Sequence, residues 1–286
     1  MVNILYSFDT KFWKLAAVSI LSALKSKRPE SKYTFYCMVA PGTRGRRKIA
    51  RLVQSFRCNI VWRPVQECEN PYRTVDFVRW SPVIFYRLFA HKIFPGAERM
   101  IYLDSDTIVL DDLTELFETD MGENVMAGVP DYSTLDHIDK HIRQLLAEKI
   151  HSGTYINSGV LLINLAKMPD IMKVDFNLVY PDQDLINVAL DGKIMKLSMR
   201  YNCIPGKIPD NMDGAPAIHH YYSIKPYYPA NYKSYIFFEQ LAEELGWTTR
   251  DFVKHEKKYS NNKTNYWFIR TSENRLRIFG ITFVRL

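Results

Sequence analysis

Two carboxylates, one residue apart, follow a short apolar run. The run Met100–Leu103 ends at Asp104, and Asp106 comes next but one, within the segment MIYLDSDTIVLDDL. Carboxylates held so close repel each other, and removing them from water is costly unless a cation lies between them. Carboxylate oxygens suit Mg²⁺ or Mn²⁺, which also bind phosphate oxygens. The pattern favours a divalent metal site over the simpler interpretation, a solvated loop with acidic turn residues.

Two histidines and a lysine further along the chain supply the other groups that such a site needs. They stand in HHYYSIKPY, residues 219–227. One histidine can complete the metal site, and Lys225 can neutralise a phosphate as a point charge. Taken alone, His219 is more simply a locally satisfied loop histidine. The D-x-D pair upstream reverses that preference and favours His219 as a third metal ligand.

A D-x-D pair after an apolar strand is typical of two enzyme classes. One is the haloacid-dehalogenase-like, Mg²⁺-dependent phosphatase, whose D-x-D-x-T string resembles residues 104–108, although the threonine stands one position early, at Thr107. The other is the nucleotide-sugar transferase of the GT-A type, in which the pair holds a metal on the diphosphate. The phosphatase motif opens its fold, whereas here a long stretch of strand and helix patterns precedes it. Position therefore favours the transferase.

The first half of the chain alternates between strand-like and helix-like patterns. These segments are Asn3–Ser7, Trp13–Leu24, Tyr33–Val39, Arg46–Phe56, Asn59–Arg63, Val83–Phe94, Met100–Leu103, Val125–Val129 and Gly159–Asn164. The alternation predicts an α/β fold with a mainly parallel central sheet flanked by helices. Ligands of such sheets bind at the carboxyl ends of the strands. At those ends the chain carries Asp9, Asp104 with Asp106, and Asp131.

Composition and charge exclude several other classes. The 286 residues are 47% hydrophobic and 24% charged, which argues against disorder, collagen and coiled coil. The four cysteines form no CxxC pair, so we expect reduced thiols in a cytoplasmic protein. No basic leader precedes an apolar run, and no run reaches the ~20 apolar residues of a membrane span. The expectation is a soluble protein or one peripheral on the inner membrane face.

The net charge of +7 is concentrated at the C-terminus. From Phe252 onward, eight basic and two acidic residues contribute +6. A nucleic-acid-binding domain carries such charge on its folded body, so no nucleic-acid partner is expected. Aromatic and aliphatic residues alternate with the arginines, and this pattern predicts an arm for an anionic membrane surface. The alternative is that Ile278–Leu286 forms a last strand or helix packed on the core.

Six blocks in order resemble the family-8 glycosyltransferases, retaining enzymes that include bacterial galactosyl- and glucosyltransferases of surface polysaccharide and glycogenin. The resemblance covers about residues 2–228. The blocks are NILYSFD at the start, FYRL at 85–88, YLDSD at 102–106, YINSGVLLIN at 155–164, PDQDLIN at 181–187, and the segment from His219 to Lys225-Pro226. The resemblance implies a single GT-A domain over 1–230 and a C-terminal extension over 231–286.

The resemblance also implies roles for individual residues. Donor-binding residues would be Ser7, Phe8, Asp9, Phe12, Arg87, Asp104, Ser105 and Lys225. The metal, Mn²⁺ or Mg²⁺, would be held by Asp104, Asp106 and His219. Residues around the reacting sugar would be Gln183 near the reacting carbon, Asp131 at a sugar hydroxyl, Asn157 on the sugar and acceptor side, and Asp182. From the residues alone, Asp182 is equally an N-cap of the helical run after it.

Three departures bear on the last block. The family pattern H-[FY]-x-G-x-x-K-P-W has its glycine replaced by Tyr222, its aromatic by His220 and its tryptophan by Tyr227. A glycine allows close backbone approach to the diphosphate, and Tyr222 removes that freedom. His220 is an alternative ligand, but the six-residue spacing to Lys225 favours His219. Thr10 stands where the family has a second uracil-side acid.

The sequence thus predicts a metal-dependent retaining hexosyltransferase. It would move glucose or galactose from a UDP-sugar to a hydroxyl acceptor on a bacterial surface glycan or glycolipid. The alternatives are the phosphatase and a non-catalytic UDP-sugar- or glycan-binding relative.

Overall fold

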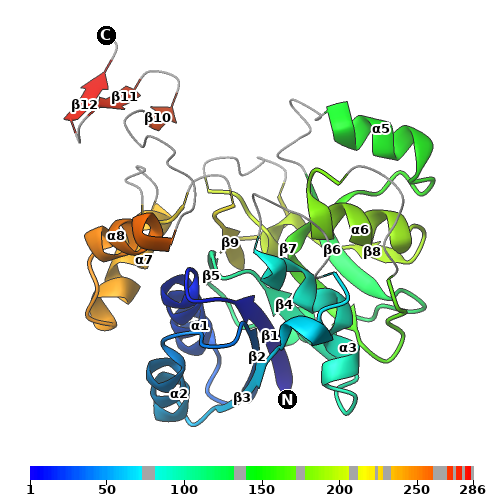
Figure 1. Ribbon diagram of the computed structural model, residues 1–286, viewed down its shortest axis with the longest axis horizontal. Coiled ribbons are helices and arrows are strands. Elements are labelled where there is room, and N and C mark those ends of the chain that lie inside the picture. The colour runs from blue at the N-terminus through cyan, green and yellow to red at the C-terminus, as the bar shows by residue number, and fades with distance from the viewer. Residues whose placement is uncertain are drawn as a thin grey trace.

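The computed structural model describes residues 1–72, 81–131, 140–171, 178–205, 212–222, 225–227, 233–259, 269–272, 275–278 and 281–284. Its centre is a seven-stranded sheet, in the order β3-β2-β1-β4-β7-β6-β8 (Figure 1). The strands are β1 (Val2–Phe8), β2 (Tyr33–Val39), β3 (Asn59–Pro64), β4 (Arg99–Leu103), β6 (Met126–Pro130), β7 (Ile156–Asn164) and β8 (Ile194–Lys196).

All neighbouring strands are parallel except where β7 pairs with β4 and with β6. The predicted mainly parallel sheet is therefore confirmed. Because β4 and β6 both run antiparallel to β7, they run parallel to each other. Their carboxyl ends, together with the start of β7, lie at one edge of the sheet.

Helices cover both faces of the sheet because successive strand residues point to opposite sides. Ile4, Tyr6 and Phe8 of β1 belong to a core cluster shared with α1 (Trp13–Ser26) and α2 (Arg46–Ser55). Leu5 belongs to the opposite cluster, shared with α3 (Ala90–Ile93) and α6 (Pro181–Ala189). Figure 1 shows α1 and α2 together on one side of β1 and α3 on the other.

Shorter elements complete the main body. They are the helices α4 (Thr114–Glu118) and α5 (Lys140–Glu148) and the 3₁₀ turns Glu67–Glu69 and Met199–Tyr201. A separate two-stranded antiparallel sheet joins β5 (Thr107–Val109) to β9 (Ile218–His220). This small sheet brings the segment after the D-x-D pair beside the distant histidines.

The segment predicted as one helix over Val83–Phe94 takes a different form. Pro82–Phe89 is a 3₁₀ helix, η2, and only Ala90–Ile93 is α-helical. Six of the eight residues of η2 are buried, so tertiary packing overrides the local preference for an α-helix. In a 3₁₀ helix, residues three apart align. Accordingly, Arg87 Nε donates a hydrogen bond to the carbonyl oxygen of Ile84 at 3.0 Å.

The C-terminal extension begins with two helices that pack on the main body. These are α7 (Lys233–Glu244) and α8 (Thr249–Tyr259), and Phe238 and Phe252 join the core cluster of α1. Phe252 stacks on Tyr227 with ring centroids 5.7 Å apart. The prediction of an arm starting at Phe252 is therefore wrong at its boundary. The reason is that the aromatic ring is 3% exposed and belongs to the core.

Three short strands follow α8 as a separate antiparallel sheet, β10 (Ile269–Ser272), β11 (Arg275–Ile278) and β12 (Ile281–Val284). In Figure 1 this sheet lies beyond α8 and away from the central sheet. Tyr266, Trp267 and Phe268 lie outside the described residues. Membrane binding by the residues after α8 stays a prediction, as does the domain boundary at residue 230.

In the part of the chain that the structure describes, no helix is both long enough and apolar enough to cross a bilayer.

The packing of α8 makes Phe252 a test of the extension's role in the fold. We expect Phe252→Ala to lower the free energy of unfolding by about 3–5 kcal/mol, the usual cost of deleting a buried phenylalanine side chain. Thermal or urea unfolding followed by circular dichroism measures the change. The matched control is Lys254→Ala, an exposed position two residues further along α8. Equal stability of both variants would show that α8 is dispensable.

Candidate active site

Three carboxylates predicted from the sequence occupy the carboxyl-end edge of the sheet. Asp9 follows β1, Asp104 follows β4, and Asp131 follows β6. The first residues of β7 and the first turn of α6 lie beside Asp104 and Asp131, through contacts described below. This edge gathers most of the residues that the sequence marked for chemistry.

The structure brings Asp104 and Asp106 together with His220. Potential ligand atoms of the three residues all lie within 4.8 Å of one another. His220 Nε2 is 3.7 Å from Asp104 Oδ2 and 3.5 Å from Asp106 Oδ1. Among the described residues this buried nitrogen has no hydrogen-bond partner. An unpartnered imidazole nitrogen facing two carboxylates is a donor set that suits Mn²⁺ or Mg²⁺.

The choice of His219 as the third ligand is therefore corrected to His220. In the β5–β9 pair, Thr107 is opposite His220 and Ile108 is opposite His219. Successive strand residues point to opposite faces, so only one of the two histidines can face the aspartates. His219 points away and is buried. Burial lowers the pKa of its imidazole to about 4.

Gly159 explains how His220 fits beside the aspartates. A Cβ added at Gly159 would lie 2.1 Å from His220 Cε1. No side chain can occupy that space, so the imidazole lies directly against the backbone of β7. Gly159 also accepts a hydrogen bond from the backbone N–H of Asp104 at 2.8 Å. Gly159 thus helps to position both Asp104 and the imidazole of His220.

Each aspartate of the D-x-D pair has its own cation. Arg87 Nη2 is 3.0 Å from Asp104 Oδ1, and Lys225 Nζ forms an ion pair with Asp106. Burial by itself raises the pKa of Asp106, but Lys225 and then His220 outweigh it and hold that pKa well below its usual range. The repulsion expected from the sequence is therefore largely compensated within the protein.

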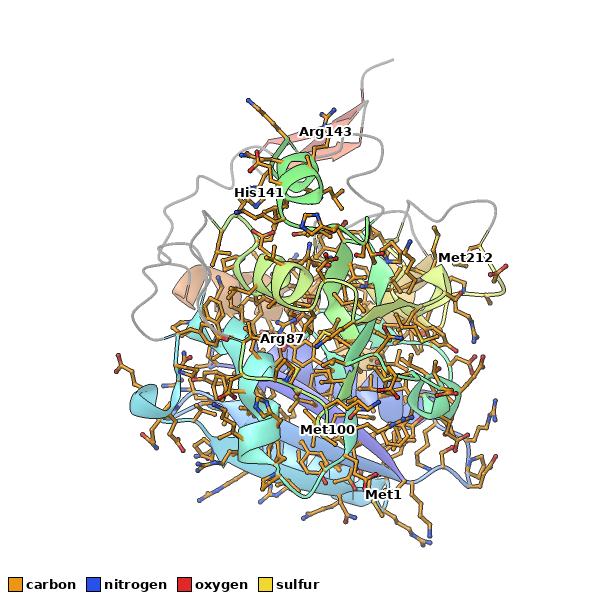
Figure 2. All side chains as sticks on the ribbon, turned by 90° about the vertical axis from the view of Figure 1, so that its right-hand side faces the viewer. Met1, Arg87, Met100, His141, Arg143 and Met212 are labelled. Atoms are coloured by element: carbon orange, nitrogen blue, oxygen red, sulfur yellow. The ribbon has the colours of Figure 1, made fainter. Side chains whose placement is uncertain are left out.

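Arg87 is the most deeply buried cation of the site and lies in the interior of the molecule (Figure 2). Its Nη1 donates to the carbonyl oxygen of Ser158 at 2.6 Å and lies 3.4 Å from Asp182 Oδ2. Its guanidinium carbon is 3.9 Å from the ring centroid of Tyr102. Burial opposes the charge, yet Asp104 and Asp182 raise the pKa of Arg87 above its ordinary value. Arg87 therefore joins the D-x-D strand to α6.

The residues predicted around the sugar form one connected group. Gln183 Nε2 donates to Asp131 Oδ2 at 2.9 Å, and Asn157 Nδ2 donates to the same oxygen at 3.4 Å. Gln183 Oε1 accepts from the backbone N–H of Ser158 at 3.0 Å. Asp182 Oδ2 accepts from Ser158 Oγ at 3.0 Å. The structure thus brings together all four of the residues predicted on the sugar side.

Asp182 is not the N-cap of α6. Tyr180 holds that position, and Asp182 lies in the first helical turn. Burial raises the pKa of Asp182, although the charge of Arg87 opposes the rise. Its carboxylate points at the site and not at the helix terminus, in keeping with the role that the family resemblance implies.

Asp184, the second aspartate of the DQD segment, has a structural function. It is fully buried, and its carboxylate accepts hydrogen bonds from Tyr155 at 2.6 Å and from the backbone N–H groups of Val179 and Tyr180 at 2.8 and 2.9 Å. His141 of α5 lies 2.9 Å from the same carboxylate. Asp184 therefore ties the start of α6 to β7 and α5 and fixes the direction of Asp182 and Gln183.

The donor-binding residues predicted in β1, just after it, and in the D-x-D segment differ in their surroundings. Phe8 lies in the core against Trp62, so its ring is part of the packing under the site. Asp9 accepts hydrogen bonds from the backbone N–H of Lys11 at 2.7 Å and from Ser81 Oγ at 2.8 Å, which shapes the loop before α1. Ser7 Oγ is buried and has no partner among the described residues, and Ser105 is buried between the two aspartates.

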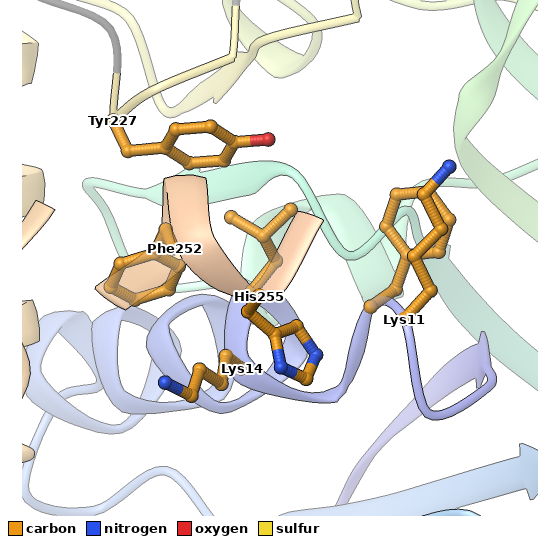
Figure 3. Close-up of a pocket in the computed structure, with 7 residues that line it drawn as sticks. Lys11, Lys14, Tyr227, Phe252 and His255 are labelled. Atoms are coloured by element: carbon orange, nitrogen blue, oxygen red, sulfur yellow. The ribbon is translucent and has the colours of Figure 1, made fainter. Parts of the chain in front are cut away.

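Phe12 lies at a pocket between the start of α1 and α8 (Figure 3). Lys11, Phe252 and His255 also line this pocket. His255 Nε2 is 2.8 Å from the carbonyl oxygen of Thr10. The C-terminal extension thus packs against the loop that joins β1 to α1.

Sequence reasoning missed Asn202 and the structural importance of Gly159. Asn202 stands alone in MRYNC, and no spacing or composition signal marks it. Gly159 was visible only as part of the YINSGV block. Both act through contacts between segments far apart in the chain.

Comparison with known proteins identifies the family. A model described as Glycosyl transferase family 8 matches residues 3–228. The chain belongs to glycosyltransferase family 8. The family resemblance seen in the sequence is confirmed, and the phosphatase alternative is excluded. The protein is a glycosyltransferase.

Curated relatives of this family-8 chain include enzymes of lipopolysaccharide. Lipopolysaccharide 1,2-glucosyltransferase of Escherichia coli (strain K12) is 24% identical over 299 residues, covering 94% of this chain and 87% of that protein. Lipopolysaccharide 1,3-galactosyltransferase of Salmonella typhimurium is 24% identical, covering 70% and 63%. A Haemophilus influenzae relative is 28% identical, covering 71% and 64%. The chain therefore spans slightly less than two thirds of two of these relatives.

Solved structures confirm the fold. An active-site mutant of LgtC superposes with a TM-score of 0.72 at 20% identity, covering 89% of this chain and all of that one. The galactosyltransferase LgtC in complex with donor and acceptor sugar analogues gives a TM-score of 0.65 at 20% identity, covering 92% and 98%. The predicted GT-A fold is confirmed.

Proposed function

We propose that this family-8 glycosyltransferase moves a hexose, glucose or galactose, from a UDP-sugar to a hydroxyl of a lipopolysaccharide-type glycolipid, with retention at the anomeric carbon and with a divalent metal. The observation that carries the proposal is the cluster of Asp104, Asp106 and His220, with Lys225 beside it. The relatives that act on lipopolysaccharide support the acceptor class.

The donor set of the cluster fits Mn²⁺ or Mg²⁺. Two carboxylates and one imidazole nitrogen are hard or borderline ligands, and the diphosphate of the donor can complete the coordination. The buried, unpartnered His220 Nε2 is the atom whose position a cation explains. When bound, the metal would supply Lewis-acid stabilisation of the charge developing on the diphosphate.

Lys225 supplies a second positive charge for the leaving group. Its ammonium is bound to Asp106 in this structure and is partly exposed, so it can turn to a phosphate oxygen. A preorganised charge aimed at the leaving group is usually among the largest contributions to such a reaction. Arg87 holds Asp104 and Asp182 in place and does not need to move.

The proposed transfer takes place on one face of the sugar. The bond from the anomeric carbon to the diphosphate oxygen breaks, the bond to the acceptor oxygen forms on the same face, and the acceptor proton passes to a diphosphate oxygen. Gln183 lies beside Asp131 at the site, but its amide is a poor nucleophile. A covalent intermediate on Gln183 is therefore not part of the proposal.

Release of UDP in the absence of an acceptor tests the proposal without a guess about the acceptor. We expect slow hydrolysis of UDP-glucose or UDP-galactose in the presence of Mn²⁺ or Mg²⁺, abolished by a chelator and restored by the metal. If the protein binds these donors but releases no UDP under any metal condition, the non-catalytic alternative holds. If UDP were released at the same rate without a metal, the proposed transferase activity would stand. Only the assignment of Asp104, Asp106 and His220 as a metal site would be wrong.

The anomeric configuration of the product tests retention. We expect the product linkage to keep the α-configuration of the UDP-hexose donor. Proton NMR of the product formed with a lipopolysaccharide-core acceptor distinguishes the two anomers by the coupling of the anomeric proton. A β-linked product would be incompatible with the proposed one-face transfer.

A further inference from the structure

We propose that Asn202 is a positioning residue that fixes the protonation form of His220 and couples the metal cluster to the sugar-side group. The inference rests on the proposed function for its metal, but the hydrogen-bond geometry itself does not. Asn202 is 3% exposed and lies in the segment before Cys203, which bridges to β9. Neither the sequence nor the family comparison assigns it a role.

The direction of the hydrogen bonds around Asn202 can be assigned by starting from a backbone N–H, which is always a donor. The backbone N–H of Gly159 donates to Asn157 Oδ1 at 3.0 Å. A backbone amide can only donate, so the Asn157 atom that faces it must be the oxygen. Asn157 Nδ2 then faces Asp131 Oδ2, an obligatory acceptor when the carboxylate is ionised, which agrees with the same orientation.

The orientation of Asn157 determines that of Asn202. The atom of Asn202 that lies 2.9 Å from Asn157 Oδ1 must be its amide nitrogen, because two carbonyl oxygens would repel. The carbonyl oxygen of Asn202 therefore faces His220 Nδ1, at 3.0 Å. Since Asn202 Oδ1 can only accept, His220 Nδ1 must carry the proton.

With a proton at Nδ1, Nε2 is the nitrogen that faces the aspartates, and its lone pair would bind the metal when one is present. A histidine that binds a metal through one nitrogen is usually held by a hydrogen bond at the other, and loss of such a partner costs about 10–100-fold in metal affinity. His220 is 2% exposed, so bulk water does not offer an alternative partner for Nδ1 in the wild type. The imidazole is pressed against Gly159 on its other side, which limits rotation of the ring.

The same hydrogen bonds continue to the sugar side. From His220 they pass through Asn202 and Asn157 to Asp131, and Gln183 donates to the same Asp131 oxygen. A change in the orientation of Asn202 would therefore alter the hydrogen bonding of Asn157, a residue predicted on the sugar and acceptor side. The side-chain amides of Asn202 and Asn157 thus connect His220 to Asp131.

Two substitutions separate the positioning role from a merely structural one. Asn202→Ala removes the hydrogen bonds of the amide to Asn157 and to His220. Asn202→Asp keeps an acceptor for His220 Nδ1 but places an oxygen against Asn157 Oδ1. Asn187→Ala is the matched control, because Asn187 is a fully buried asparagine whose amide, among the described residues, bonds to backbone groups of Ile156 and Gln183 and not to another side chain.

Long-range ¹H–¹⁵N NMR of the protein loaded with Mg²⁺ and UDP shows directly which nitrogen of His220 carries the proton. We expect the Nδ1–H form of His220 in the wild type, in Asn202→Asp and in Asn187→Ala, and its loss in Asn202→Ala. The His220 signals are assigned by their absence in His220→Gln. An Nε2–H form in the wild type, or an unchanged form in Asn202→Ala, overturns the inference without touching the proposed function.

Titration of Mn²⁺ in the presence of UDP, followed by electron paramagnetic resonance, gives the second readout. We expect Asn202→Ala to bind Mn²⁺ about 10–100-fold more weakly, and Asn202→Asp and Asn187→Ala to bind it within a few-fold of the wild type. Equal affinity in wild type and Asn202→Ala overturns the inference. Absence of Mn²⁺ binding in the wild type overturns the proposed metal and the inference together.

Discussion

Asp106→Asn is expected to lower metal-dependent UDP release about 10³-fold. A catalytic metal contributes several kcal/mol of charge stabilisation, and each 1.36 kcal/mol corresponds to about a tenfold change in rate. Asparagine keeps the size of the side chain but removes the charged ligand atom and the partner of Lys225. Release of UDP from the donor sugar at saturating Mn²⁺ measures the loss.

Thermal stability of the same variant carries a second expectation. Repulsion between Asp104 and Asp106 alone predicts that removing one carboxylate stabilises the metal-free protein. The structure reverses this expectation, because Lys225 and His220 hold the pKa of Asp106 low. A carboxyl group with a lowered pKa in the folded state stabilises the protein above its unfolded pKa and loses that contribution as the pH falls. Asp106→Asn should therefore melt at a lower temperature at neutral pH.

Asp120→Asn is the matched control for both measurements. Asp120 is exposed and accepts a hydrogen bond from the backbone N–H of Gly122, which asparagine can also accept. This variant should behave as the wild type. Near wild-type turnover of Asp106→Asn would remove Asp106 from the metal cluster, whatever its effect on stability.

His220→Ala is expected to reduce turnover by at least about 100-fold, whereas His219→Leu should keep near wild-type turnover. Loss of His220 removes the nitrogen ligand that faces both aspartates, and loss of such charge stabilisation is worth several kcal/mol. His219 has two buried ring nitrogens without a partner among the described residues, so leucine removes no hydrogen bond. Steady-state kinetics over a range of Mn²⁺ concentrations compares the two variants.

Added imidazole gives a sharper test of the His220 assignment. The alanine variant opens a space beside Gly159 that matches the missing ring. Free imidazole should therefore restore part of the activity of His220→Ala and leave His219→Leu unchanged. Loss of activity on replacing His219, with His220→Ala active, would mean that β9 is shifted by one residue relative to β5.

Much of the fold and of the site could be predicted from the sequence because the signals are local. The apolar run before Asp104 and the alternation of strand and helix patterns predict a parallel sheet with acids at one edge. The segments at 155–164 and 181–187 indicate the family and, through it, Asp131, Asn157 and Gln183. In each case neighbouring residues in the chain carry the information.

The tertiary structure decided what depends on pairing between distant segments. Whether His219 or His220 faces the aspartates depends on the register of β9 against β5, and a one-residue shift exchanges the two faces of a strand. Spacing from Lys225 cannot determine that register, since the sequence does not specify the backbone conformation of the residues between the histidines and Lys225.

Charge compensation and protonation were likewise decided by folding. The sequence by itself determined that two carboxylates stand at the end of a buried strand. Only the folded chain pairs Asp104 with Arg87 and Asp106 with Lys225, and only the fold sets Asn202 against His220. The physical reason is that the pKa of a carboxyl group and the proton position of an imidazole depend on atoms within a few ångströms, and these atoms come from strands, helices and loops far apart in the chain.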